Sequence, residues 1–260
     1  MEKMPKKRAE KRINFAGGGT STAQMIRPSK QETAKEFLFQ KTPTSVYVSR
    51  RFVKKMLVIG ISEVCRQRLA FAEDEFTSRT AGDMKVQVLN PFEESGNDNA
   101  DSMKGWLRTI FNLAEKGWLS KVFICIGKGN APEKKPLEVY GFGIKETDIC
   151  KEMDEHAVID LTEDEDAQLR NEAEDLLQGI KKKIPKTPLD DVKFSIQVVL
   201  NDQAPEKLDL EDFHSSRQPE VKRARTLFER GCKTPFHKIR TIGVQAGKKE
   251  DDGDSSPSGW

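Results

Sequence analysis

The chain has 260 residues, of which 33% are charged and 36% are hydrophobic. The charged share exceeds the roughly 25% of an average globular domain, so part of the chain is expected to lie outside a hydrophobic core. No run approaches the ~18 apolar residues of a membrane span, and the charged N-terminus lacks the apolar stretch of a signal peptide. We therefore expect a soluble, non-secreted protein.

Residues 1–44 are predicted to form a flexible basic arm. Residues 1–40 carry nine basic and four acidic side chains without an apolar period, so burial cannot offset the entropy of ordering them. A basic cluster in this arm is a candidate nuclear-import signal or nucleic-acid contact, and a solvated tail is the alternative explanation. The cluster comprises Lys6, Lys7, Arg8, Lys11 and Arg12.

The next part of the chain predicts two helices and a hairpin. From Ser45 the apolar residues recur at helical spacing, although a strand remains an alternative for residues 56–61. A second amphipathic helix begins at Asp101 or Ser102 as its N-cap, after a short strand candidate at residues 84–89. Two apolar segments separated by a turn are then predicted to pair as a hairpin. They are Lys121–Gly127 and Pro136–Glu146.

A third helix and a third strand follow. Thr162 and Glu165 have the spacing of a capping box, and helical periodicity continues to the lysines at 181–183. Acidic residues at the start of a helix and basic ones at its end complement the helix dipole. This explains the thirteen acidic and two basic side chains of residues 146–175 without a binding role. Residues 191–200 then alternate apolar and polar side chains, which predicts a strand with one face on the core.

These elements predict an α+β fold in which helices pack on a small antiparallel sheet. Residues 201–232 show little periodicity, and strand-like composition returns only with KTPFHKIRTIGV at residues 233–244. A structureless connection of about 30 residues inside a domain is unusual unless it is functional. The predicted divisions are the arm at 1–44, a core at 45–200, a C-terminal segment at 201–244 and a disordered tail at 245–260.

The sequence contains no recognisable catalytic or metal-binding pattern. His156, His214 and His237 lie in separate regions without zinc-site spacing, and there is no phosphate-binding glycine loop. Four widely spaced cysteines indicate reduced thiols of an intracellular protein rather than a disulfide scaffold or zinc site. We expect a protein that is not an enzyme and that has no metal, cofactor or small-molecule substrate. The cysteines are Cys65, Cys125, Cys150 and Cys232.

Four stretches of the chain, spanning residues 45–244, occur in the order found in a known family. They are SVYVSRRFVKKMLVIGISEVCRQRLAFAEDEF with DMKVQVL, DSMKGWLRTIFNLAEKGWLSKVFICIG, PLEVYGFGIKE and TPFHKIRTIGV. Together they resemble the HORMA domain, and within that family the meiotic chromosome-axis branch. TPFH followed by alternating residues most favours this branch over the spindle-checkpoint, translesion-polymerase and autophagy branches.

The resemblance implies a HORMA fold whose C-terminal segment is a safety belt. Such a belt wraps around a short partner peptide, the closure motif, and then adds its own strands to the sheet. Residues 201–232 would be the belt loop, and residues 234–244 its locking strand. We expect the peptide to bind beside the third strand and its flanking helix, at Leu176, Ile180, Phe194, Ile196 and Val198. We expect the belt to be locked by Pro235, Phe236, His237, Ile239 and Ile242. Ordinary core packing is the alternative explanation for these side chains.

The leading hypothesis is a nuclear protein of meiotic chromosomes that captures closure motifs of axis partners, with other HORMA proteins as further candidates. It would support axis assembly, homologue pairing, synapsis and recombination, and an AAA+ ATPase would remodel it. One alternative is a HORMA adaptor of the spindle checkpoint or of translesion polymerases. The other is direct binding of chromatin or DNA through the basic arm and the basic residues of 217–240.

Overall fold

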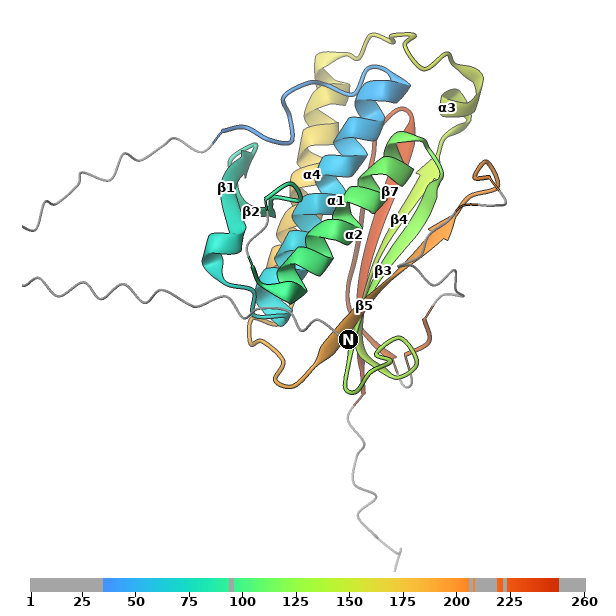
Figure 1. The fold of residues 1–260 in the computed structure, drawn as a ribbon. Coiled ribbons are helices and arrows are strands. Elements are labelled where there is room, and N and C mark those ends of the chain that lie inside the picture. The colour runs from blue at the N-terminus through green and yellow to red at the C-terminus, as the bar shows by residue number, and fades with distance from the viewer. Residues whose placement is uncertain (1–34, 94–95, 206–207, 209–218, 222–223, 248–260) are drawn as a thin grey trace, which may run out of the picture. The chain divides into compact units, whose positions relative to one another are not determined.

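The computed structural model describes residues 35–93, 96–205, 208, 219–221 and 224–247, so the predicted basic cluster of the arm and residues 248–260 of the predicted tail lie outside the described residues. Five strands form an antiparallel sheet in the order β5-β3-β4-β7-β6 (Figure 1). The predicted α+β class is therefore confirmed. In spatial order the strands are β5 (Lys193–Leu200), β3 (Leu119–Gly127), β4 (Pro136–Glu146), β7 (His237–Ala246) and β6 (Ala224–Lys233).

Three helices cover one face of this sheet, which we call the helix face, and the opposite face is called the outer face (Figure 1). These helices are α1 (Val46–Arg68), α2 (Asp98–Glu115) and α4 (Glu163–Lys183). The remaining elements are the 3-10 helix η1 (Glu73–Glu75), the hairpin strands β1 (Phe76–Ala81) and β2 (Met84–Leu89), and the short helix α3 (Asp148–Glu152). None of the described helices has both the length and the apolar composition needed to cross a membrane.

Helix α1 forms the centre of the core. The Ser45 hydroxyl accepts a hydrogen bond from the backbone N–H of Val48 at 3.3 Å and so caps the helix. Ile61 and Val64 are fully buried, because α1 contacts α2, α4 and β2 as well as the sheet. Residues 56–61 are helical, so length and enclosure outweigh the strand preference of their β-branched side chains.

The other two long helices begin at side-chain caps. Thr162 and Glu165 form the predicted capping box at the start of α4, and these hydrogen bonds lower the pKa of Glu165. Helix α2 begins earlier than predicted, because the Asn97 side chain accepts hydrogen bonds from the N–H groups of Asn99 and Ala100. Residues 97–102 contain several polar side chains that could cap a helix, and the structure uses the first of them, Asn97.

The boundary of the N-terminal arm lies earlier than the predicted residue 44. The Phe37 N–H donates to the carbonyl of Thr80 in β1 at 2.8 Å. Leu38 is only 1% exposed and belongs to the main core cluster. β1 itself, which pairs with the predicted strand β2, was not predicted, because its sequence FTSRTA is mostly polar.

The predicted hairpin of β3 and β4 is confirmed, and residues 193–200 form the predicted strand β5. Burial does not alternate along β5, because Gln197 is buried as well as Ile196 and Val198. Ile196 faces the core of the helix face. The outer face is also covered in part, since Phe123, Cys125 and Val139 form a second buried cluster there, with Val221 packed against it. The sheet therefore has a core on both faces, which the polar side of β5 did not predict.

The predicted belt loop at residues 201–232 is too long, because residues 224–233 form strand β6. Only Phe228 and Cys232 of this strand are buried, and most of its other side chains are exposed. A strand at the edge of a sheet with so few buried positions shows no clear period of two. The second strand of this hairpin, β7, contains the stretch that the sequence predicted.

Candidate functional site

The two outermost strands of the sheet, β5 and β6, are protected very differently. β6 carries four charged residues, and it packs against α4. Charged side chains and a covering helix are among the usual means by which proteins prevent an edge strand from pairing with another chain. β5 carries only one charged residue, Lys193, at its first position. The edge of β5 is therefore the one suited to accept a further strand.

β5 offers main-chain groups rather than side chains at this edge. One side of the strand pairs with β3, and no described strand pairs with the other side. Eight residues in extended conformation present an edge of roughly 26 Å, long enough for a short peptide. A peptide that adds as a sixth strand would gain main-chain hydrogen bonds.

The predicted peptide-binding residues of β5 point into the core of the helix face. Ile196 and Val198 are each 3% exposed. The ring of Phe194 lies 5.7 Å from Trp106 and 6.0 Å from Phe71, measured between centroids. These three side chains pack β5 against the core of the domain. A peptide at the edge would therefore pair with the main chain of β5 and would not contact these side chains directly.

The structure does not bring Leu176 and Ile180 to the β5 edge. Both are 1% exposed and lie on α4, which packs against β6 at the opposite end of the sheet. The Glu172 carboxylate of α4 accepts a hydrogen bond from the backbone N–H of Lys233 at 3.0 Å. The prediction that α4 flanks the third strand is therefore wrong, because helical periodicity shows which residues are buried but not which strand they cover.

The connection from β5 to β6 joins opposite edges of the sheet and contacts both of its faces. It begins at Asn201, whose backbone N–H donates to Trp118 at 2.9 Å and whose side chain donates to Gly117 at 2.6 Å. Further along, Leu208 packs against the core of the helix face, whereas Val221 packs against the buried cluster of the outer face. A segment that passes beside β5 would therefore lie next to this connection.

The turn between β6 and β7 is held deep in the domain. The Thr234 N–H donates to the carbonyl of His237, and the His237 N–H donates to the Thr234 hydroxyl, both at 2.8 Å. Between them, Phe236 is fully buried in a small cluster with Val46 and Cys150. The turn thus inserts an aromatic anchor between the start of α1 and helix α3.

Hydrogen bonds from two helices fix the same turn. The Ser49 hydroxyl in α1 lies 2.8 Å from the Thr234 hydroxyl and 2.7 Å from Nδ1 of His237. The residue that caps α3, Thr147, donates its N–H to Phe236 at 2.9 Å and its hydroxyl to Pro235 at 2.6 Å. We call this arrangement the hairpin lock, and its members are Ser49, Thr147, Thr234, Pro235, Phe236 and His237.

The structure brings together three of the five predicted lock residues. Pro235, Phe236 and His237 form the turn itself, whereas Ile239 belongs to the main core and Ile242 lies on the outer face opposite Gly141. Sequence reasoning missed the partners Ser49, Thr147 and Thr234. Ser49 gave one signal, because it is a small polar residue among the apolar positions of a predicted buried helix.

A potential ligand cluster adjoins the lock. Glu146, Cys150 and His237 place one potential metal-ligating atom each within 4.8 Å of one another. Burial and the nearby Glu146 raise the pKa of Cys150 to about 11, and burial and Arg50 lower the pKa of His237 to about 4. The Arg50 guanidinium, 3.6 Å from Glu146, opposes a cation there. A neutral network of polar groups explains the cluster better, and the expected lack of a metal or cofactor stays a prediction.

An unprotected sheet edge and a connection that leads to a locked hairpin suit a domain that pairs with a segment of another chain. The chain belongs to the HORMA domain family, whose model matches residues 49–237. Domains of this family are typically protein-interaction adaptors. The predicted HORMA fold is therefore confirmed.

Three known proteins illustrate the similarity. HORMA domain-containing protein 1 of Danio rerio is 30% identical over 102 residues, which is 39% of this chain and 28% of that protein. The C. elegans HTP-1 structure bound to a HIM-3 closure motif has a TM-score of 0.62 at 15% identity, over 80% of this chain and 94% of that chain. A chain of the mitotic checkpoint complex has a TM-score of 0.57 at 15% identity, over 77% of this chain and 99% of that chain. At this identity the two structures establish the fold.

Proposed function

We propose that this chain is a meiotic chromosome-axis protein that captures closure-motif peptides of axis partners at the edge of β5. The observation that carries the proposal is the contrast between the weakly charged edge of β5 and the protected edge of β6. The likeness to HTP-1, solved with a closure motif, supports a peptide as the added strand. The similarity to HORMA domain-containing protein 1 supports a HORMA domain as the capturing unit.

Capture would proceed by strand addition followed by enclosure. The peptide pairs with the main chain of β5, and the connection at residues 201–223 encloses it while β6 and β7 remain on the opposite side of the sheet. Release then requires local opening of that connection or of the hairpin lock, which lengthens the residence time without a large interface. An AAA+ ATPase would supply the work of reopening.

The proposed setting is the nucleus, on meiotic chromosomes, where capture of partner peptides would assemble the axis and support pairing, synapsis and recombination. Other HORMA proteins carrying closure motifs are candidate partners. The function needs no catalytic group, since recognition relies on main-chain hydrogen bonds and enclosure.

Hydrogen exchange of the full chain with and without closure-motif peptides tests this proposal. Peptides from axis partners should protect the amides of residues 193–200 and leave those of β7 unchanged, because only the edge of β5 gains hydrogen-bond partners. Scrambled peptides of the same composition are the control. Protection at β6, or no binding of any axis peptide by the folded chain, would contradict the proposal.

A second candidate is a HORMA adaptor of another pathway, which the likeness to a chain of the mitotic checkpoint complex favours. The geometry of strand addition would be the same, so only the partner differs. Peptides from checkpoint and translesion-polymerase partners belong in the same exchange experiment. Tighter binding of one of these than of any axis peptide would assign the chain to that pathway.

A further inference from the structure

The outer face of the sheet carries a row of three lysines. Lys233, Lys238 and Lys145 are direct cross-strand partners on β6, β7 and β4, and all three are exposed. Two residues further along β7, Arg240 points to the same face, and Lys121 of β3 lies in that second row. We call these five residues the basic shelf.

This arrangement is unfavourable for the isolated fold. Like charges directly opposite each other on adjacent strands destabilise a sheet. Among the described residues, none of the four lysines has a carboxylate within salt-bridge distance, and only Arg240 is paired, with Glu229. A bound polyanion would remove the repulsion that the fold itself leaves uncompensated.

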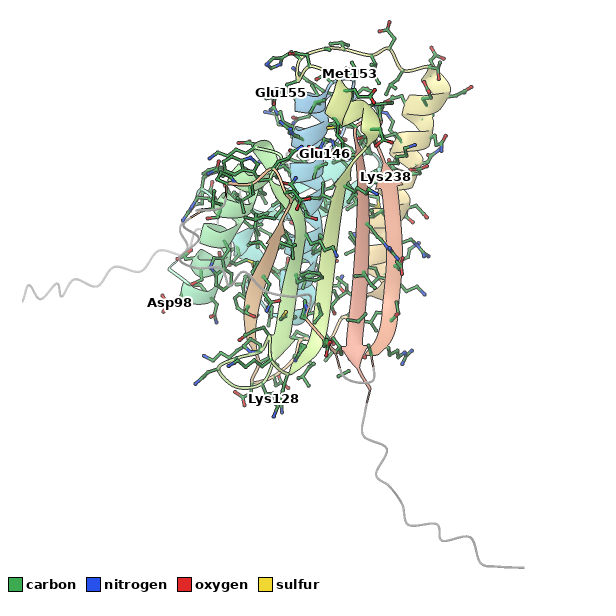
Figure 2. The ribbon with its side chains drawn as sticks, turned by 90° about the vertical axis from the view of Figure 1, so that its right-hand side faces the viewer. Asp98, Lys128, Glu146, Met153, Glu155 and Lys238 are labelled. Atoms are coloured by element: carbon green, nitrogen blue, oxygen red, sulfur yellow. The ribbon has the colours of Figure 1, made fainter. Side chains whose placement is uncertain are left out.

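The basic shelf continues into a cleft of about 800 Å³ at one end of the strands. Four shelf residues line this cleft together with Arg50 and Lys151, against two carboxylates, Glu146 and Asp202. Figure 2 looks onto the outer face and shows Lys238 and Glu146 at this end, far from Lys128 at the other. Basic side chains therefore outnumber carboxylates along this cleft.

The floor of the shelf is flat. Gly143 lies between Arg240 and Lys121, and Gly231 flanks Arg240 on its other side. A Cβ added at Gly143 would meet only one neighbouring atom within 4 Å, the carbonyl oxygen of Arg240 at 3.8 Å. An added Cβ at Gly231 would instead meet the carbonyl oxygen of Ile239 at 2.9 Å, so it is Gly143 that leaves room for a ligand between Arg240 and Lys121.

We propose that the basic shelf binds the phosphate backbone of duplex DNA without reading its sequence. Peptide partners rely on buried aromatic or aliphatic anchors, but none of the exposed large hydrophobic side chains of the described residues belongs to a strand of the shelf; they are Tyr47, Phe92, Ile149 and Val158. Backbone phosphates require only a fixed array of basic groups. The five shelf residues belong to β3, β4, β6 and β7 rather than to β5 or to the predicted basic cluster of residues 6–12, so the proposal does not rest on peptide capture.

The salt dependence of binding tests the size of this site. If all five shelf residues neutralise phosphates, the logarithm of the affinity should fall with the logarithm of salt concentration with a slope of about −4.5. Anisotropy of a fluorescent 20-base-pair duplex, titrated with the full chain at several salt concentrations, measures this slope. Failure of the wild-type chain to bind at low salt would overturn the proposal.

The decisive comparison uses two double variants of equal charge. Lys145→Gln with Lys238→Gln should weaken duplex binding and make the slope shallower by about two. Lys128→Gln with Lys134→Gln removes two exposed charges at the other end of the strands and should change neither. Equal losses of duplex affinity in both variants would show that binding depends on the net charge of the chain and not on the basic shelf.

A competing ligand and a parallel assay complete the test. A polyglutamate peptide of matched charge should compete more weakly than the duplex, and tighter binding of that peptide would overturn the assignment to DNA. Closure-peptide binding by the shelf variant should match wild type. Loss of peptide binding with duplex binding retained would instead count against the proposed function alone.

Discussion

β5 and β6 are the two outermost strands of one sheet. The edge of β5 is suited to pair with a further strand, whereas the edge of β6 is protected against such pairing. β6 has charged side chains and a helix packed on it, and its turn is held by the hairpin lock. β5 is mostly uncharged, and its described edge carries no further strand. The difference indicates that the sheet is extended permanently on one side by the chain itself and is left available on the other.

The largest effect is expected from Phe236→Asp, which should break the hairpin lock. Phe236 is fully buried, and an unpaired carboxylate there costs several kcal/mol. The β6–β7 hairpin should detach and the peptide off-rate should rise by a factor of about 100 or more, while α1 and β3 stay protected in hydrogen exchange. Phe92→Asp, at a side chain that is 77% exposed, is the matched control. An unchanged off-rate in Phe236→Asp would show that the lock does not retain the peptide.

Acidification should destabilise the hairpin lock, because His237 is one of its buried members. Above pH 6.5 the imidazole is neutral in both the folded and unfolded chain. Below that pH the unfolded chain binds a proton that the buried ring, whose pKa is about 4, does not accept, so the free energy of unfolding falls. The loss approaches roughly 3 kcal/mol by pH 4.

Urea unfolding between pH 7 and pH 4.5 measures this contribution. His237→Gln should remove this part of the pH dependence, whereas the same change at the exposed His156 should leave it intact. If both variants keep the wild-type pH profile, His237 titrates normally and the lock is not closed around it.

A smaller effect is expected from Ser49→Ala. This change removes the hydroxyl that joins Thr234 to His237 and leaves buried polar groups without a partner, at a cost of about 1–3 kcal/mol. Amides of the hairpin turn should exchange faster, and the peptide off-rate should rise less than in Phe236→Asp. Ser102→Ala, at an exposed position of α2, controls for loss of a hydroxyl in a helix. Identical exchange in the two variants would exclude a role for Ser49 in the lock.

The smallest effect is expected from Ser195→Lys. This change gives β5 a second charged side chain, and charged side chains are part of what protects the edge of β6. Ser195 lies half-buried on β5, and a lysine there must lose hydration when a peptide strand is added. We expect peptide affinity to fall by about tenfold, or ~1.4 kcal/mol, without loss of fold. Thr226→Lys on β6 is the control, and equal weakening by both would show that the peptide does not distinguish the edges.

Much of the fold could be predicted because its signals are local. Thr162 and Glu165 are three residues apart, and their capping box defines the start of α4 from sequence alone. The hairpin of β3 and β4 follows from two apolar runs and a short turn. β6 could not be predicted in this way, because its stability comes from pairing with β7 and from α4 rather than from its own periodicity.

The candidate site was predicted less completely than the fold. The stretch TPFH identified Pro235, Phe236 and His237, but their partners Ser49 and Thr147 lie far away in the chain. Leu176 and Ile180 were correctly expected to be buried and were assigned to the wrong strand. Periodicity reports that a residue is buried, whereas its neighbours depend on how the helices cross the sheet.

The sequence by itself determined the helices, the hairpin, the alternating strand β5 and the return of strand composition at residues 233–244, because each depends on residues close together in the chain. Only the tertiary structure decided which edge of the sheet each strand occupies. It placed β7 between β4 and β6, left the edge of β5 available and aligned three lysines across separate strands. Strand order and cross-strand register depend on contacts between distant residues, and no local pattern of side chains encodes them.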